Sequence, residues 1–219
     1  MKVKGVPTRG ASTPVVPPVD PKHTALLVMD YQTAILGSLS NDLGNADALL
    51  ARTTQAIAAF RWRGAHVGYV RVAFEDADFA AIPSTNKMFA GLAAAGRDFH
   101  SDSPGTAIDE RIAPKAGDIV VRKTRVGAFS TTDLDQQLRD RGIDTLVLAG
   151  ISTSGVVLST VRAASDLDYR VIVLADGCAD REPDVHDFLI EKIFPRQADV
   201  ITYAELHGLF AGPEESPSS

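Results

Sequence analysis

Residues 144–168 read as a buried strand that turns sharply into a helix. The apolar strand covers residues 146–149 and runs into Gly150, and a helical pattern follows from about residue 156 to residue 167. Between them lie small hydroxyl residues, namely Ser152, Thr153 and Ser154. Such a turn brings the free N–H groups of the helix to the carboxyl end of the strand, where they can hold an anion. Open α/β sheets bind their ligands at this edge.

Strands and helices alternate along the rest of the chain. Apolar runs predict strands at residues 24–29, 66–72, 119–121, 146–149, 170–175 and 199–202. Helical periodicity predicts helices at residues 46–63, 133–141, 156–167 and 184–194, with a shorter helix near residues 86–95 and a helical turn at residues 205–210. This alternation implies right-handed βαβ crossovers and a parallel sheet that helices cover on both faces.

Composition narrows the class of protein. A chain of 219 residues with 45% hydrophobic and 23% charged residues fits one large globular domain. Its net charge of −6 argues against a binder of nucleic acid or of acidic membranes. No apolar run approaches the roughly 20 residues that span a bilayer. A single cysteine and the lack of an apolar signal segment favour a cytoplasmic protein.

Proline marks the N-terminal segment. Residues 1–22 hold five of the twelve prolines, which predicts an extended arm. We interpret it either as a loose tail or as an arm that lies on a neighbouring subunit. A single folded domain is expected over residues 23–210, and a flexible acidic tail over residues 211–219.

Charged residues occupy the carboxyl ends of several predicted strands. Asp30 follows the first strand, Arg71 ends the second, and Lys123 follows the third. Because these ends share one edge of a parallel sheet, the side chains are expected around one crevice with the turn at Gly150. Burying a carboxylate is costly unless it is paired, which favours a functional role for Asp30 over a role in a turn. For Arg71 and for Arg125, which follows the third strand, a surface salt bridge is as good an explanation as binding of an anionic group.

Two kinds of site are not indicated. Neither the phosphate-loop pattern nor the dinucleotide-binding pattern occurs in the sequence. The five histidines lie far apart, and none has metal-ligand spacing with another ligand residue. We therefore expect no metal and no cofactor.

Three motifs, in order, resemble the isochorismatase-like hydrolase superfamily, whose relatives include nicotinamidases and N-carbamoylsarcosine amidohydrolase. They are LVMDYQ at residues 27–32, RKTRVGAF at residues 122–129 and GISTSGVV at residues 150–157. The resemblance covers about residues 23–206 and implies a three-layer α/β/α sandwich with a six-stranded parallel sheet. It also implies that Asp30 and Lys123 are catalytic and that the peptide bond between Ile151 and Ser152 is cis.

One position departs from the amidases of this superfamily. Those members carry the pattern S-T-S-G-C, with the cysteine as nucleophile, whereas this chain has Val156 at the cysteine position. A valine side chain cannot attack a carbonyl carbon. Cys178 follows the fifth predicted strand and is not expected to replace the missing thiol. A thiol-based amidase mechanism is therefore disfavoured.

The resemblance also implies a reaction that needs no thiol. True isochorismatases lack the cysteine too; their aspartate protonates the vinyl ether carbon of the substrate, and water adds to the resulting cation. The segment over residues 74–114 is expected to exclude water from such a site, with Phe79, Met88 and Phe89 as apolar lining. The expected substrate-binding residues are Gln32, Arg71, Phe89, Arg125, Phe129, Ser152, Thr153, Ser154 and Val156.

Three functions remain open at this point. The first is a cofactor-free hydrolase of a small carboxylate-bearing molecule, with Asp30 as general acid or base and Lys123 as its partner. The second is an amide or carbamoyl hydrolase in which Ser154 or water replaces the thiol. The third is a non-catalytic small-molecule binder or assembly protein. A homodimer or homotetramer is expected, because the family often assembles and because helix 184–194 has more apolar residues than one stripe needs.

Overall fold

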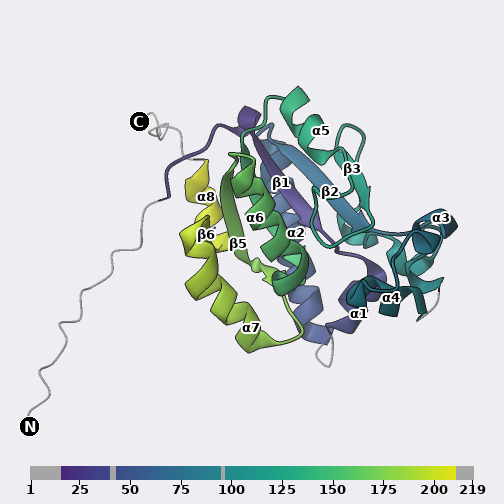
Figure 1. Cartoon of the computed structure of the whole chain (residues 1–219). Coiled ribbons are helices and arrows are strands. Elements are labelled where there is room, and N and C mark those ends of the chain that lie inside the picture. Colours follow the sequence, from purple (N-terminus) through teal and green to yellow (C-terminus); the bar gives the residue numbers. More distant parts are fainter. Residues whose placement is uncertain (1–15, 40–42, 95–96, 211–219) are drawn as a thin grey trace, which may run out of the picture.

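The computed structural model describes residues 16–39, 43–94 and 97–210, and these form a parallel sheet between layers of helices (Figure 1). The described strands are β1 (Thr24–Met29), β2 (His66–Val72), β3 (Ile119–Lys123), β4 (Thr145–Ile151), β5 (Arg170–Ala179) and β6 (Asp199–Ile201). Their order in the sheet is β3-β2-β1-β4-β5-β6, and every neighbouring pair is parallel. The order reverses between β1 and β4, and sheets of this kind bind ligands outside the carboxyl ends of the strands at that point.

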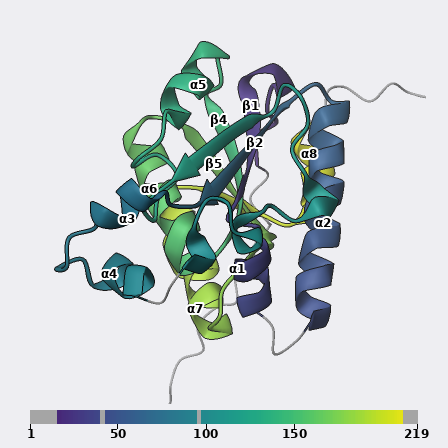
Figure 2. The ribbon, with the colours of Figure 1, turned by 90° about the vertical axis from the view of Figure 1, so that its right-hand side faces the viewer.

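Each face of the sheet has its own covering helices, which makes three layers (Figure 2). One face is covered by α2 (Leu43–Trp62) and α8 (Leu206–Leu209), and the other by α5 (Leu134–Asp140), α6 (Leu158–Asp166) and α7 (Pro183–Phe188). Successive side chains of β1 point to opposite faces, so Leu26 packs in one core and Leu27 in the other. The predicted three-layer sandwich with a six-stranded parallel sheet is confirmed.

Strand β5 is longer than predicted. The predicted end at residue 175 is wrong, because the strand continues to Ala179 through the Asp-Gly pair that reads as a turn. The register shifts opposite the end of β4, and Gly150 pairs with Cys178 beyond the shift. Tyr31 fixes this part of the strand by donating a 2.6 Å hydrogen bond to the carbonyl of Gly177. The extension places residues 180–182 at the carboxyl edge of the sheet.

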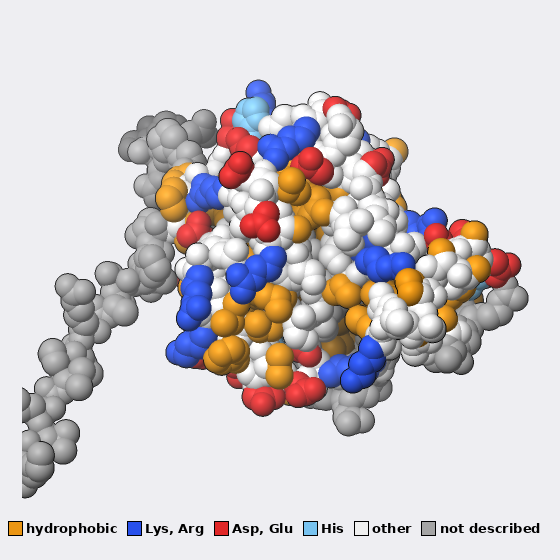
Figure 3. All heavy atoms as spheres, viewed as in Figure 1, with side chains coloured by type: hydrophobic (Ala, Val, Ile, Leu, Met, Phe, Trp, Pro, Cys, Tyr) orange, Lys and Arg blue, Asp and Glu red, His pale blue; other side chains and the backbone are white. Residues whose placement is uncertain are grey.

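The predicted helix over residues 184–194 is interrupted. Helix α7 ends at Phe188, and a π-helical turn (Leu189–Ile193) and a 3₁₀ turn (Phe194–Arg196) follow it. Leu189 and Phe194 are buried, whereas Phe188 is 57% exposed. Figure 3 shows hydrophobic side chains gathered over the part of the surface where α7 lies. The expected homodimer or homotetramer stays a prediction.

Short helices lie at the carboxyl edge of the sheet (Figures 1 and 2). They are α1 (Thr33–Ser38), α3 (Asp76–Ala80), α4 (Lys87–Ala94) and the 3₁₀ turns Arg97–Phe99 and Pro104–Thr106. A third 3₁₀ turn, Glu110–Ile112, packs against α2 instead. We call the described residues of segment 74–112 the cap. Helix α4 confirms the short helix predicted near residues 86–95, although residue 95 lies outside the described residues. Arg122 anchors the cap by donating hydrogen bonds to Asp78 and to the carbonyl of Ala73.

The described part of the predicted arm lies against the domain. Val19 donates a 3.0 Å backbone hydrogen bond to Leu209, and Arg170 donates a 2.6 Å hydrogen bond to the carbonyl of Pro17. The rest of the arm, residues 1–15, and the predicted tail, residues 211–219, lie outside the described residues. Within the described residues, no helix is long and apolar enough to span a membrane.

Candidate active site

Asp30 lies directly after β1 in a backbone conformation that few residues adopt. Its φ is +61°, in the left-handed region. Its N–H donates a 2.8 Å hydrogen bond to the carbonyl of Val70 on β2. Aspartate tolerates this conformation better than most residues other than glycine. The carboxyl group points into the protein, and only 7% of the side chain is exposed.

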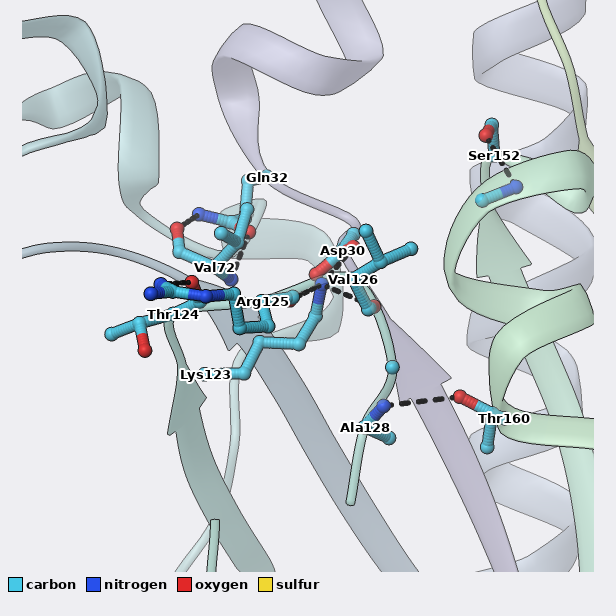
Figure 4. A network of polar contacts seen from close by, with 12 residues as sticks. Asp30, Gln32, Val72, Lys123, Thr124, Arg125, Val126, Ala128, Ser152 and Thr160 are labelled. Atoms are coloured by element: carbon cyan, nitrogen blue, oxygen red, sulfur yellow. Dashed lines mark hydrogen bonds and ion pairs between the residues drawn. The ribbon is translucent and has the colours of Figure 1, made fainter. Parts of the chain in front are cut away.

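Lys123, the last residue of β3, meets Asp30 across β2 (Figure 4). Its Nζ lies 2.8 Å from Oδ2 of Asp30. The same nitrogen donates hydrogen bonds to the carbonyls of Arg125 at 3.2 Å and Val126 at 3.0 Å. An ammonium group has three N–H donors, so these three acceptors match its full capacity. The predicted meeting of Asp30 and Lys123 is therefore present in the structure.

Burial controls the ionisation of Asp30. Removal from water raises the pKa of its carboxyl group, and the charge and hydrogen bond of Lys123 lower it by less, so the pKa lies at about 6. Among the described residues, the second carboxyl oxygen, Oδ1, has no hydrogen-bond partner. Both protonation states of Asp30 are accessible near neutral pH, with one oxygen left to meet a substrate.

The turn after β4 completes this edge of the sheet. The peptide bond between Ile151 and Ser152 is cis, and Oγ of Ser152 accepts a 3.0 Å hydrogen bond from the N–H of Gly155. A Cβ at Gly150 would lie 2.8 Å from a methyl group of Val157, so glycine lets the following turn pack closely on the strand. Residues Thr153–Val157 form a π-helical turn before α6 begins.

A cavity of about 470 Å³ opens between this turn, the cap and the pair of Asp30 and Lys123. The predicted site residues that line it are Asp30, Phe89, Lys123, Arg125, Ile151, Ser152, Ser154 and Val156. Met88, predicted as apolar lining, lines it as well. A volume of this size suits a small organic molecule.

Gln32 and Arg71 lie outside the cavity lining. The Gln32 side chain is fully buried and donates hydrogen bonds to the carbonyls of Val72 at 2.8 Å and Thr106 at 2.9 Å. Its Oε1 accepts a third, of 2.8 Å, from the N–H of Val72. Arg71 donates a 3.4 Å hydrogen bond to the same Thr106 carbonyl. Both side chains tie the cap to the sheet, so the structure gives neither a route to a substrate.

Replacing Gln32 by leucine should therefore lower stability. The change would leave the N–H and carbonyl of Val72 without the Gln32 partner and would leave the carbonyl of Thr106 only its 3.4 Å hydrogen bond from Arg71. We expect a loss of roughly 2–4 kcal/mol in the free energy of unfolding, measured by urea denaturation. The exposed neighbour Thr33 provides the control, because Thr33→Ala should change stability by less than about 0.5 kcal/mol. Equal effects of the two changes would contradict this role of Gln32.

Three other residues that were predicted to bind substrate or to line the site lie outside the cavity lining. Phe129 stacks on Tyr169, with ring centroids 6.0 Å apart, on the face covered by α5 and α6. Thr153 is fully buried, and its Oγ1 lies 2.8 Å from Nδ1 of His186 on α7. Phe79, predicted as lining, stacks inside the cap on Phe74. None of the three is among the residues that line the cavity.

A charged segment of the cavity, residues 180–182, was not predicted from the sequence. Asp180, Arg181 and Glu182 follow the extended end of β5 and line the cavity. Oδ2 of Asp180 accepts 2.7 Å hydrogen bonds from the N–H and from the hydroxyl of Ser154. Burial raises the pKa of Asp180, but these hydrogen bonds outweigh it and leave the pKa below its ordinary value. The only signal in the sequence was the charge of the segment, since the predicted strand ended too early.

No thiol lines the cavity. Val156 is 2% exposed and lines it at the helix N-terminal turn. Cys178 is the single cysteine of the chain and lies buried in β5, where burial raises its pKa to about 12. Its Sγ donates a long 3.8 Å contact to the carbonyl of Leu148. Cys178 is thus placed as a core residue, away from the lining of the cavity.

Within the described residues, no group of three or more His, Cys, Asp or Glu side chains is arranged to hold a metal ion. A buried acid with a raised pKa beside an ammonium group, in a cavity at the carboxyl edge of a parallel sheet, is typical of enzymes that act on small molecules.

Comparison with known proteins identifies the family of this chain. The sequence matches the isochorismatase domain over residues 24–205. It is 33% identical over 178 residues to the uncharacterised isochorismatase family protein YwoC of Bacillus subtilis, covering 81% of this chain and 89% of the relative. It is 30% identical over 221 residues to a ureidoacrylate amidohydrolase of Methylobacterium radiotolerans, covering 91% of this chain and 84% of the relative.

The fold comparison agrees. The structure of an isochorismatase family protein from Burkholderia thailandensis superposes with a TM-score of 0.74 at 29% identity, covering 89% of this chain and 98% of that protein. The chain belongs to the isochorismatase family and is a hydrolase of that family.

Proposed function

We propose that this hydrolase acts on a small carboxylate-bearing molecule by general acid catalysis through Asp30, without a thiol nucleophile. The observation that carries the proposal is the buried pair of Asp30 and Lys123 in a cavity whose helix N-terminal position holds Val156. A protonated carboxyl group can donate a proton to a substrate, and a pKa of about 6 keeps a useful fraction of Asp30 protonated near neutral pH.

The reaction that needs only this group is the hydrolysis of a vinyl ether. Asp30 transfers its proton to the vinyl carbon, which leaves an oxygen-stabilised cation. Water adds to the cation and returns a proton to the Asp30 carboxylate. The adduct then loses its alcohol, so the products are a carbonyl compound and an alcohol. The apolar cap residues Phe89, Leu92 and Phe99 line one side of the cavity, and an apolar lining of this kind can protect the cation from competing reactions.

Lys123 supports this cycle by staying in place while the charge of Asp30 changes. Its two backbone acceptors, the carbonyls of Arg125 and Val126, hold the ammonium group whether or not Asp30 is ionised. After proton transfer, the ammonium group stabilises the carboxylate that forms, because opposite charges attract strongly in a buried site. Lys123 is thus proposed to position Asp30 and to stabilise its ionised form.

Amide or carbamoyl hydrolysis is the second candidate, and the similarity to a ureidoacrylate amidohydrolase favours it. In that case the Asp30 carboxylate would act as a general base on water. Ser154 is a poor candidate for the nucleophile. Its hydroxyl donates to Asp180, whose lowered pKa makes it a weak base, and His186 contacts Thr153 instead.

The pH dependence of kcat/KM should separate the two candidates. If Asp30 is the general acid, activity falls as the pH rises through about 6, because the protonated form is lost. If Asp30 is the general base, activity rises through the same pH and then levels off. The measurement needs vinyl ether and amide substrates that do not themselves titrate between pH 5 and 8.

The residual activity of Asp30→Asn is the control, since it should lack the pH-dependent limb near 6. A wild-type profile that is flat between pH 5 and 8 would contradict a role for Asp30 in proton transfer. Binding of ligands by calorimetry without turnover of any vinyl ether or amide would instead point to a non-catalytic binder.

A further inference from the structure

Arg125 presents a guanidinium group to the cavity, and no carboxylate of the described residues is in ion-pair contact with it. The pKa of Asp78 is lowered by the N–H of Glu75, by Arg122 and, less, by the charge of Arg125. The Arg125 guanidinium group lies 5.3 Å above the centre of the Phe89 ring, a distance at which a cation and an aromatic face attract. One N–H donates to the carbonyl of Thr124. Arginine has five N–H donors, and no other hydrogen bond or ion pair of Arg125 is found among the described residues.

Two other arginines in this part of the chain have an acidic partner within ion-pair distance. Arg122 pairs with Asp78, and Arg111 pairs with Asp109. Arg125 is half-buried and lines an apolar part of the cavity, where removal from water weakens the hydration of its charge. An anionic group of a ligand would supply the acceptor that the described residues do not.

The wall around Arg125 is apolar. Phe89, Leu92, Phe99 and Val126 line this side of the cavity. Phe89 is nearly buried and packs against Phe74, with ring centroids 6.0 Å apart, so the wall has a supported shape. A ligand that fills this space buries hydrocarbon against it, and each buried CH₂ group strengthens binding by about fourfold.

Arg125 is also tied to the reacting pair. Its backbone carbonyl accepts from the Lys123 ammonium group, which contacts Asp30. The side chain therefore starts beside the acid and reaches along the wall to Phe89. Arg181 lines the cavity too, but no contact fixes its guanidinium group among the described residues. A preorganised donor loses less freedom on binding than a free one.

We propose that Arg125 binds the substrate carboxylate and that the substrate is an amphiphilic monocarboxylate whose apolar body lies against Phe89 and Leu92. This assignment depends on the proposed function only in placing the reacting bond near Asp30. Binding of the carboxylate by Arg125 does not require turnover. A planar guanidinium group matches a carboxylate with two parallel hydrogen bonds, which an amide of the same shape cannot accept as well.

The test compares two probes by calorimetry on the full chain, 3-phenylpropionate and its neutral analogue 3-phenylpropanamide. The wild type should bind the carboxylate more tightly than the amide by roughly tenfold or more. Arg125→Gln should lower the affinity for the carboxylate by a similar factor and change the affinity for the amide by less than about twofold. Acetate, which lacks the apolar body, should bind at least roughly tenfold more weakly than 3-phenylpropionate.

Arg181→Gln is the matched control, because it removes the other guanidinium group of the cavity and should leave the carboxylate affinity within about twofold. Loss of carboxylate affinity in Arg181→Gln but not in Arg125→Gln would overturn the assignment. So would equal binding of the two probes, or no binding of the carboxylate, by a folded wild type. Asp30→Asn should still bind 3-phenylpropionate, so failure of the catalytic proposal and failure of this one give different results.

Discussion

Asp30→Asn is expected to lower kcat/KM by roughly 10³-fold or more, because the amide cannot donate or accept the proton that the reaction moves. The size of the side chain is kept, and asparagine tolerates the left-handed backbone at position 30. Oδ1 of the amide can still accept from Lys123, so the fold should persist. The measurement is steady-state kinetics on a vinyl ether substrate, with circular dichroism to confirm that the variant is folded.

A carboxylate remote from the cavity provides the comparison. Asp140 is exposed near the end of α5 and contacts only Gln136 among the described residues. Asp140→Asn removes the same charge and should leave kcat/KM within about twofold. If a folded Asp30→Asn enzyme keeps wild-type kcat/KM, the reaction does not pass a proton through Asp30.

Val156→Cys should give the enzyme an amide-hydrolysing activity roughly 10²-fold or more above the wild type. The new thiol would lie in the cavity, at the turn that leads into α6. A helix N-terminus favours the thiolate, and the Asp30 carboxylate, which predominates above pH 6, can take up the thiol proton. Lys123 would remain in place to hold Asp30. The gain is measured as ammonia release from a panel of primary amides.

The native cysteine sets the background for this experiment. Cys178 is buried and its raised pKa disfavours the thiolate, so iodoacetamide should alkylate position 156 much faster. Val156→Cys combined with Asp30→Asn should lose the gained activity. A variant whose new thiol is alkylated but which hydrolyses no amide would show that more than the thiol separates this cavity from that of a cysteine amidase.

The fold was largely predictable because its strands are local apolar runs. Each of the predicted strands exists, and the charges at their ends share the expected edge. The extension of β5 was not predictable from local sequence. Its Asp-Gly pair favours a turn, but distant partners hold it in the strand: the hydroxyl of Tyr31, 146 residues away, donates to the carbonyl of Gly177, Arg52 donates to the carbonyl of Asp176, and the strand pairs beside Gly150. The turn preference of the Asp-Gly pair is thus overridden by contacts that form only in the folded chain.

The site was predictable in its centre and less so around it. Asp30 and Lys123 were placed by the rule that strand ends meet, and the structure brings them into contact. Gln32 follows Asp30 closely but points to Val72 and Thr106, partners 40 and 74 residues away. The direction of a side chain in a segment without regular periodicity depends on which distant backbone groups need partners. Asp180 was missed for the same kind of reason, because its place depends on the end of β5.

The left-handed backbone at Asp30 has a consequence for how variation at this position is interpreted. Residues other than glycine, asparagine and aspartate are strained there by about 1–2 kcal/mol, whatever their chemistry. In a saturation library, most inactive variants at position 30 would therefore also be less abundant in the cell, and an alanine scan would mix both effects. Glycine and asparagine alone report on the proton donor, since they remove the carboxyl group and keep the chain's path.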